Sequence, residues 1–227
     1  VYRSMKERIF QFGNARSLFG ITSEPTGEFD PTDRPALIFL NAGLIHRVGP
    51  NRMYVSMARR AANAGHIALR FDFAGSGDSR PRVNQVSLED RGREDTLDAM
   101  NDLQSRKAVD KFILIGLCSG ADDALRIARQ DPRVVGACCI DVATYTSRGY
   151  DIHRYSGRLL RRQSWFDLLT GQSDIWKMLR RSKSPRKGVP EPAMDWNVVD
   201  ADELVDATEE LAARNCRTLI VLSGGSP

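Results

Sequence analysis

The chain has 227 residues, of which 41% are hydrophobic and 27% are charged, and these values are typical of a globular domain. They exclude a disordered or collagen-like chain, and no apolar run reaches the roughly 18–20 residues that a membrane span needs. The net charge of +4 is too small to indicate nucleic-acid binding by itself. Four cysteines without metal-ligand spacing argue against a zinc site or a disulfide scaffold, and free thiols favour a cytoplasmic protein.

Short apolar runs alternate with amphipathic segments along most of the chain. The predicted strands cover residues 8–12, 17–22, 35–40, 66–73, 111–118, 134–142 and 218–222. The predicted helices cover residues 53–64, 87–106, 121–129 and 200–213. The first two strands flank Gly13 and Asn14, which predicts a hairpin. The later alternation of strand and helix predicts an α/β fold, a mostly parallel sheet with helices on both faces.

One segment interrupts this alternation. Residues 145–199 have no strand pattern, and leucines and aromatic residues there are interspersed with basic ones. Residues 148–187 hold eleven Lys or Arg and only three Asp. We therefore expect a helical, basic insertion in an α/β core formed by residues 1–144 and 200–227. The simplest interpretation of this insertion is a solvated helical lid. If its charge does bind a ligand, an anionic ligand is favoured over nucleic acid, because no nucleic-acid recognition fold accompanies the charge.

The segment Gly116-Leu117-Cys118-Ser119-Gly120 lies where an apolar strand ends and a helix begins. Glycines two residues before and two after Cys118 allow strand and helix to approach closely around a strained residue whose side chain is exposed above the sheet. The following helix N-terminus would stabilise a thiolate. This pattern predicts a nucleophile elbow with Cys118 as the nucleophile. Ser119 is the less favoured nucleophile, because larger residues would then flank it, and an inert buried Cys118 is the remaining alternative.

Two further turns follow predicted strands. Residues 41–44 (Asn-Ala-Gly-Leu) occupy the place where a hydrolase sheet donates a backbone N–H to a tetrahedral intermediate. We expect the N–H groups of Leu44 and Ser119 to form this oxyanion hole. The glycines of residues 72–79 predict a tight turn whose Asp and Ser side chains bind its own backbone. A phosphate-binding loop is disfavoured there, because the Walker lysine is missing.

In order and spacing, these three segments resemble the α/β-hydrolase superfamily, over residues 8–144 and again over 218–225. More narrowly, NAGLIHRVGPNR, GLCSGAD and the RLLRR and WFDLLTG segments resemble the exosortase-A-associated hydrolases, which accompany bacterial exopolysaccharide and protein-sorting gene clusters. The resemblance implies an esterase, a thioesterase or an acyl transferase. It also implies a small-molecule or carrier-bound acyl substrate, anionic ones included, with the insertion as a lid and with no metal or organic cofactor.

The resemblance also implies a catalytic acid and a histidine base, both placed after the strand 218–222. The chain ends shortly after that strand, so we expect the C-terminal part of the fold to be absent from this sequence. Asp141 resembles an alternative acid position at the end of the preceding strand. The histidines His46, His66 and His153 are not at the expected base position. A catalytically incomplete binding or scaffold protein is therefore the alternative function.

Overall fold

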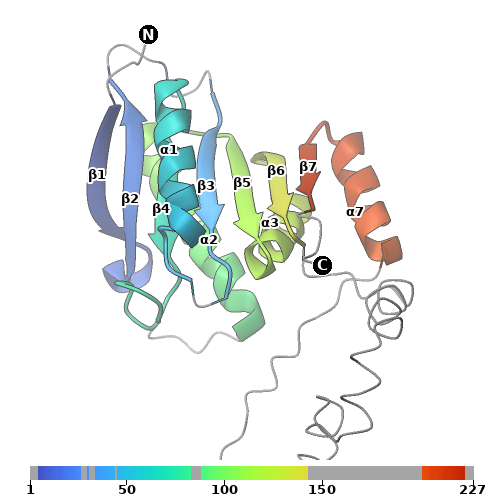
Figure 1. Ribbon diagram of the computed structural model, residues 1–227, viewed down its shortest axis with the longest axis horizontal. Coiled ribbons are helices and arrows are strands. Elements are labelled where there is room, and N and C mark those ends of the chain that lie inside the picture. Colours follow the sequence, from blue (N-terminus) through green and yellow to red (C-terminus); the bar gives the residue numbers. More distant parts are fainter. Residues whose placement is uncertain are drawn as a thin grey trace, which may run out of the picture. The chain divides into compact units, whose positions relative to one another are not determined.

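A computed structural model describes residues 5–26, 30, 34–43, 45–82, 88–142 and 201–222 (Figure 1). The basic insertion predicted over residues 145–199 lies outside these ranges, and so does Leu44. None of the described helices is long and apolar enough to cross a membrane.

The described strands form one seven-stranded sheet with the order β1-β2-β4-β3-β5-β6-β7. They are β1 (Met5–Phe12), β2 (Leu18–Pro25), β3 (Ala36–Leu40), β4 (Ala68–Asp72), β5 (Phe112–Leu117), β6 (Val134–Ile140) and β7 (Arg217–Val221). The first two strands form an antiparallel hairpin, and β2 is also antiparallel to β4. All other pairs are parallel. The predicted hairpin and the mostly parallel sheet are thus confirmed.

Helices cover both faces of this sheet (Figure 1). They are α1 (Met53–Asn63), α2 (Leu88–Lys107), α3 (Ser119–Gln130) and α7 (Ala201–Ala213). Successive side chains of β3 alternate between the two faces. Ile38 and Leu40 join the core that α2, α3 and α7 share, whereas Phe39 packs against Tyr54 of α1, with ring centroids 5.1 Å apart. Burial on both faces explains why these strands are almost continuously apolar.

Helix α3 begins at Ser119, two residues earlier than the sequence predicts. The carbonyl of Cys118 already accepts the N–H of Ala121 at 2.8 Å, so the first helical turn starts directly at the end of β5. Because β3 to β6 run parallel, their carboxyl ends lie at one edge of the sheet. The predicted elbow, the turn after β3 and the turn after β4 all belong to that edge, which is where open α/β sheets bind ligands.

Candidate active site

Cys118 connects β5 to α3 with φ 52° and ψ −123°. A non-glycine residue in such a conformation costs about 1–3 kcal/mol and persists only where its surroundings enforce it. Three backbone hydrogen bonds do so here. The Cys118 N–H donates to the carbonyl of Ile140 at 2.8 Å, and the Cys118 carbonyl accepts from Ala121 at 2.8 Å and from Asp122 at 3.3 Å. The strained elbow that the sequence predicts is therefore present, and its strained residue is Cys118 and not Ser119.

The two flanking glycines are required by space. A Cβ atom on Gly116 would overlap the carbonyl of Gly120. A Cβ atom on Gly120 would lie 2.5 Å from the carbonyl oxygen of Leu40 and 2.7 Å from that of Asn41. Strand β5, helix α3 and the end of β3 therefore meet with backbone against backbone, which is the close approach that the glycine spacing indicates.

Ser119 connects the elbow to the turn after β3. As the first residue of α3, it has an N–H that no helical carbonyl can accept. Its Oγ accepts a hydrogen bond of 2.8 Å from the N–H of Gly43. Gly43 has φ +50°, and apart from its chain neighbours no described residue has an atom within 4 Å of its Cβ position, so among these residues the backbone and not space calls for glycine. No sequence pattern predicts this side-chain contact, because its two residues lie 76 positions apart.

The turn after β4 has the internal bonds that the sequence predicts. The buried carboxylate of Asp72 accepts the N–H of Asp78 at 3.1 Å. The Ser79 hydroxyl donates to the Asp72 carbonyl at 2.6 Å and accepts the N–H of Phe19 at 2.8 Å. These contacts fasten the turn to β2 and are those of a structural turn.

Asp141, the predicted alternative acid, follows β6 at the same edge of the sheet. Leu117 of β5 pairs with Ile140 of β6, and Cys118 and Asp141 are the residues that directly follow this pair. Asp141 has φ +47°, and its N–H donates to the carbonyl of Val221 at 2.8 Å. Its backbone is thereby fixed between β6 and β7, beside the elbow.

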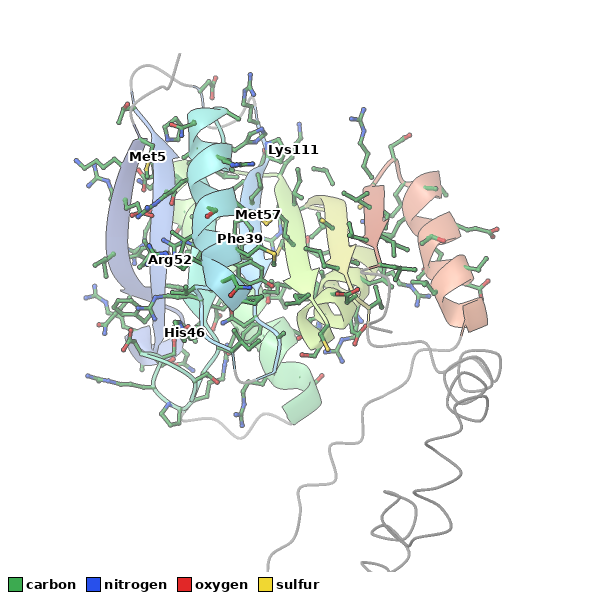
Figure 2. The ribbon with its side chains drawn as sticks, viewed as in Figure 1. Met5, Phe39, His46, Arg52, Met57 and Lys111 are labelled. Atoms are coloured by element: carbon green, nitrogen blue, oxygen red, sulfur yellow. The ribbon has the colours of Figure 1, made fainter. Side chains whose placement is uncertain are left out.

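The two described histidines lie elsewhere. His46 is exposed in the turn after β3, on the side where the parallel strands end (Figure 2). His66 precedes β4 at the opposite end of the strands, and its Nδ1 lies 2.9 Å from the carbonyl of Pro35. Within the described residues, neither of these histidines has a hydrogen bond to Cys118; His153 lies outside them.

The other three cysteines are poor candidates for a nucleophile. Burial raises the pKa of the Cys138 and Cys216 thiols above the ordinary value. Burial raises the pKa of Cys139 further, to about 12. All four cysteines are free thiols. Because the thiolate is the reactive form, the thiols of Cys138, Cys139 and Cys216 will react slowly at neutral pH.

A hollow of about 290 Å³ lies between β1, β2 and the end of α2. Its lining includes Thr22 and Glu24, and Thr22 pairs with Leu69 near the start of β4. The hollow is therefore remote from the edge that carries Cys118, and none of the predicted site residues that the structure describes (Cys118, Ser119 and Asp141) lines it.

No protein-family model matches the chain, and no curated protein matches it. Solved structures do. An esterase from Pyrococcus furiosus matches with a TM-score of 0.56 and 14% identity over 96% of this chain and 83% of that one. An α/β hydrolase from Penicillium matches with a TM-score of 0.53 and 14% identity over 98% of this chain and 90% of that one. A hypothetical protein from Pseudomonas aeruginosa matches with a TM-score of 0.50 and 18% identity over 74% of this chain. This chain spans only 55% of the length of that protein. The chain therefore has the α/β-hydrolase fold.

Proposed function

We propose that the protein is a hydrolase that forms an acyl-enzyme on Cys118 from an ester or a thioester. The observation that carries this proposal is the strained conformation of Cys118 between Gly116 and Gly120, at the start of α3. Such strain lowers stability, and strained residues of this kind cluster at reactive sites. The elbow raises the side chain above the end of a central strand, where a substrate can reach it.

The reaction begins when the Cys118 sulfur, as a thiolate, attacks the substrate carbonyl carbon. A C–S bond forms, and the carbonyl π electrons move to the oxygen. The N–H of Ser119 and a second N–H from the turn after β3, for which we propose Leu44, would bind this oxyanion. The intermediate then collapses and breaks the bond to the leaving oxygen or sulfur, which takes up the proton that the Cys118 thiol had given to the proposed histidine base. Water hydrolyses the resulting thioester and restores the thiol, whereas another nucleophile would complete an acyl transfer.

Asp141 is the acid that we propose for orienting a histidine base, because it lies beside the elbow on the next strand. We further propose residues 145–199 as a lid whose basic side chains attract an anionic or carrier-bound acyl group. The similarity of the NAGLIHRVGPNR and GLCSGAD segments to exosortase-A-associated hydrolases supports a role beside bacterial exopolysaccharide synthesis.

The test uses p-nitrophenyl acetate, whose leaving group departs without protonation and so reports acylation alone. We expect one acetyl group on Cys118, shown by intact mass and peptide mapping, and formed about 10²–10³-fold faster than on free cysteine. Cys118→Ala should lose this labelling, and Cys138→Ala, which removes another half-buried thiol, should keep it. Acetylation or turnover that survives in Cys118→Ala would refute the proposal. A Cys118 that is inert to both the ester and iodoacetamide would favour the alternative, a binding or scaffold protein.

A further inference from the structure

Asp72 ends β4 with a carboxylate that is fully buried. Oδ1 accepts the backbone N–H of Arg47 at 2.7 Å, and Oδ2 accepts both the Arg47 guanidinium and the N–H of Asp78, the latter at 3.1 Å. Removing a carboxylate from water costs several kcal/mol unless charged and hydrogen-bonding partners compensate for it. Two separate loops, one after β3 and one after β4, are therefore held to the same buried charge.

Arg47 is fixed by more than this carboxylate. Its guanidinium also binds the Asp78 carboxylate at 2.6 Å and lies 4.5 Å from the centre of the Phe19 ring. The Arg47 side chain is only 15% exposed. The later part of the turn after β3 is thus attached to β2, to β4 and to the turn after β4.

The beginning of the same turn is fixed as well. The Asn41 side-chain amide donates to the carbonyl of Phe71 at 2.9 Å, and Gly43 donates to Ser119. Leu44, the proposed donor, lies in the sequence between Gly43 and Arg47. A backbone donor serves an oxyanion only if it is held within about 0.5 Å of the productive position. The turn has anchors on both sides of that residue.

The second loop closes tightly on the carboxylate. Gly77 has φ +51°, and a Cβ atom there would overlap the carboxylate of Asp72. Glycine is therefore required both for the backbone and for the contact. This packing gives the Asp72 side chain little freedom to leave Arg47.

We propose that Asp72 is a positioning residue for the acylation site. Acting through Arg47, it holds the turn after β3 where its amides can stabilise the oxyanion formed at Cys118. This inference rests on the proposed function. Asp72 touches no substrate in this scheme, so its loss should slow acylation and leave ester binding almost unchanged. A displacement of about 1 Å in such a turn can cost up to about 100-fold in rate.

The experiment compares Asp72→Asn and Arg47→Gln with Asp78→Asn as the matched control. Asp78 binds the same guanidinium, but its carboxylate is 60% exposed, and its substitution keeps the backbone N–H. Single-turnover acetylation by p-nitrophenyl acetate gives the acylation rate and the half-saturating ester concentration. We expect Asp72→Asn and Arg47→Gln to acylate about 10–100-fold more slowly with the same half-saturation, and Asp78→Asn to stay within about threefold. Arg47→Lys, which keeps the charge, should recover part of the rate.

Two further readouts separate positioning from general damage. Alkylation of Cys118 by iodoacetamide needs no oxyanion and should keep its wild-type rate in every variant. Hydrogen exchange should become faster at the amides of residues 41–49 and stay unchanged in β5. Wild-type acylation in both Asp72→Asn and Arg47→Gln, or slowed alkylation in both, overturns the inference.

If the proposed function itself is wrong, the result differs, because Cys118 of the wild-type protein is then not acylated. Hydrogen exchange then decides the positioning role, and unchanged exchange in residues 41–49 overturns it. If Asp72→Asn or Arg47→Gln does not fold, Arg47→Lys provides the test, because it keeps a cation beside the buried carboxylate and should still acylate more slowly than wild type.

Discussion

The amide of Gly43 and the hydroxyl of Ser119 are joined by a hydrogen bond of 2.8 Å. Leu40 and Gly116 pair across the parallel strands β3 and β5, and Gly43 and Ser119 each lie three residues further on. The register of the two strands therefore carries over into the two loops. This bond connects the proposed oxyanion turn to the elbow, so the two parts of the candidate site move together.

The first prediction concerns Ser119→Ala. The variant should still be acylated on Cys118, but about threefold to tenfold more slowly, because a hydrogen bond of net value about 1 kcal/mol that steadies Gly43 is lost. Burst kinetics with p-nitrophenyl acetate measure the rate. Ser105→Ala, which removes an exposed hydroxyl on α2, should stay within about twofold. Complete loss of acylation in Ser119→Ala would instead make Ser119 the nucleophile.

The second prediction concerns the contact between elbow and sheet. Gly120→Ala places a methyl group 2.5 Å from the carbonyl oxygen of Leu40, and two backbones must separate to admit it. We expect a loss of about 3 kcal/mol or more in the free energy of unfolding, measured with urea. Gly136→Ala is the control, because its nearest neighbours lie at 3.3 Å, and we expect it to change stability by less than about 1 kcal/mol. Equal stability of the two variants would contradict the close approach.

The third prediction concerns Glu7, which connects three elements. It accepts hydrogen bonds from Arg59 of α1 at 2.8 Å and from the buried Arg70 of β4 at 3.0 Å. The hydrogen bond from Arg59, with the charges of both arginines, lowers the pKa of Glu7 below its ordinary 4.5 although partial burial opposes this. The stability that this gives is present above the unfolded-state pKa and is lost as the pH falls through the folded-state pKa.

Unfolding of wild type and Glu7→Gln at several pH values tests this. The wild type should be more stable near neutral pH, and its advantage should shrink as the pH falls below about 4.5. A difference that does not depend on pH would mean that the ionisation of Glu7 is not linked to folding.

Local patterns were sufficient to predict most of the fold. The apolar run of β5 and the glycines around Cys118 predicted strand, elbow and helix, because backbone contacts impose these residues locally. Strand β1 was predicted to begin at Arg8, but it begins at Met5. The charged side chains of Lys6 and Glu7 interrupt the apolar pattern that predicts a strand. In the folded protein, Glu7 pairs with Arg70, which lies 63 residues away.

The anchors of the candidate site could not be predicted in the same way. Arg47 and Asp72 are 25 residues apart, and Gly43 and Ser119 are 76 apart. No sequence periodicity relates such pairs, because the strand order β4-β3-β5 brings their loops together. The sequence predicts Asp72 only as a turn residue, although it also binds the neighbouring loop through Arg47.

The last prediction concerns Asp123 on α3. Its contribution to stability should change with pH in the direction opposite to that of Glu7. A Cβ atom on Gly92 of α2 would overlap the Asp123 carboxylate, so the two helices are in close contact there. Burial raises the pKa of Asp123 above its ordinary 3.8, although the ion pair with Arg126 at 2.7 Å opposes the shift. At this carboxylate the folded state therefore binds a proton more tightly than the unfolded state does. The contribution of Asp123 to stability falls as the pH rises from about 3.8 through the folded-state pKa.

Asp123→Asn removes this penalty and keeps the size of the side chain. Relative to wild type, the variant should gain stability as the pH rises from about 3.8 toward neutrality, whereas Glu7→Gln should lose it over its own window. Urea unfolding of the three proteins across the same pH series measures both trends with one method. If Asp123→Asn instead became less stable than wild type with rising pH, the ion pair with Arg126 would outweigh the cost of burying the charge.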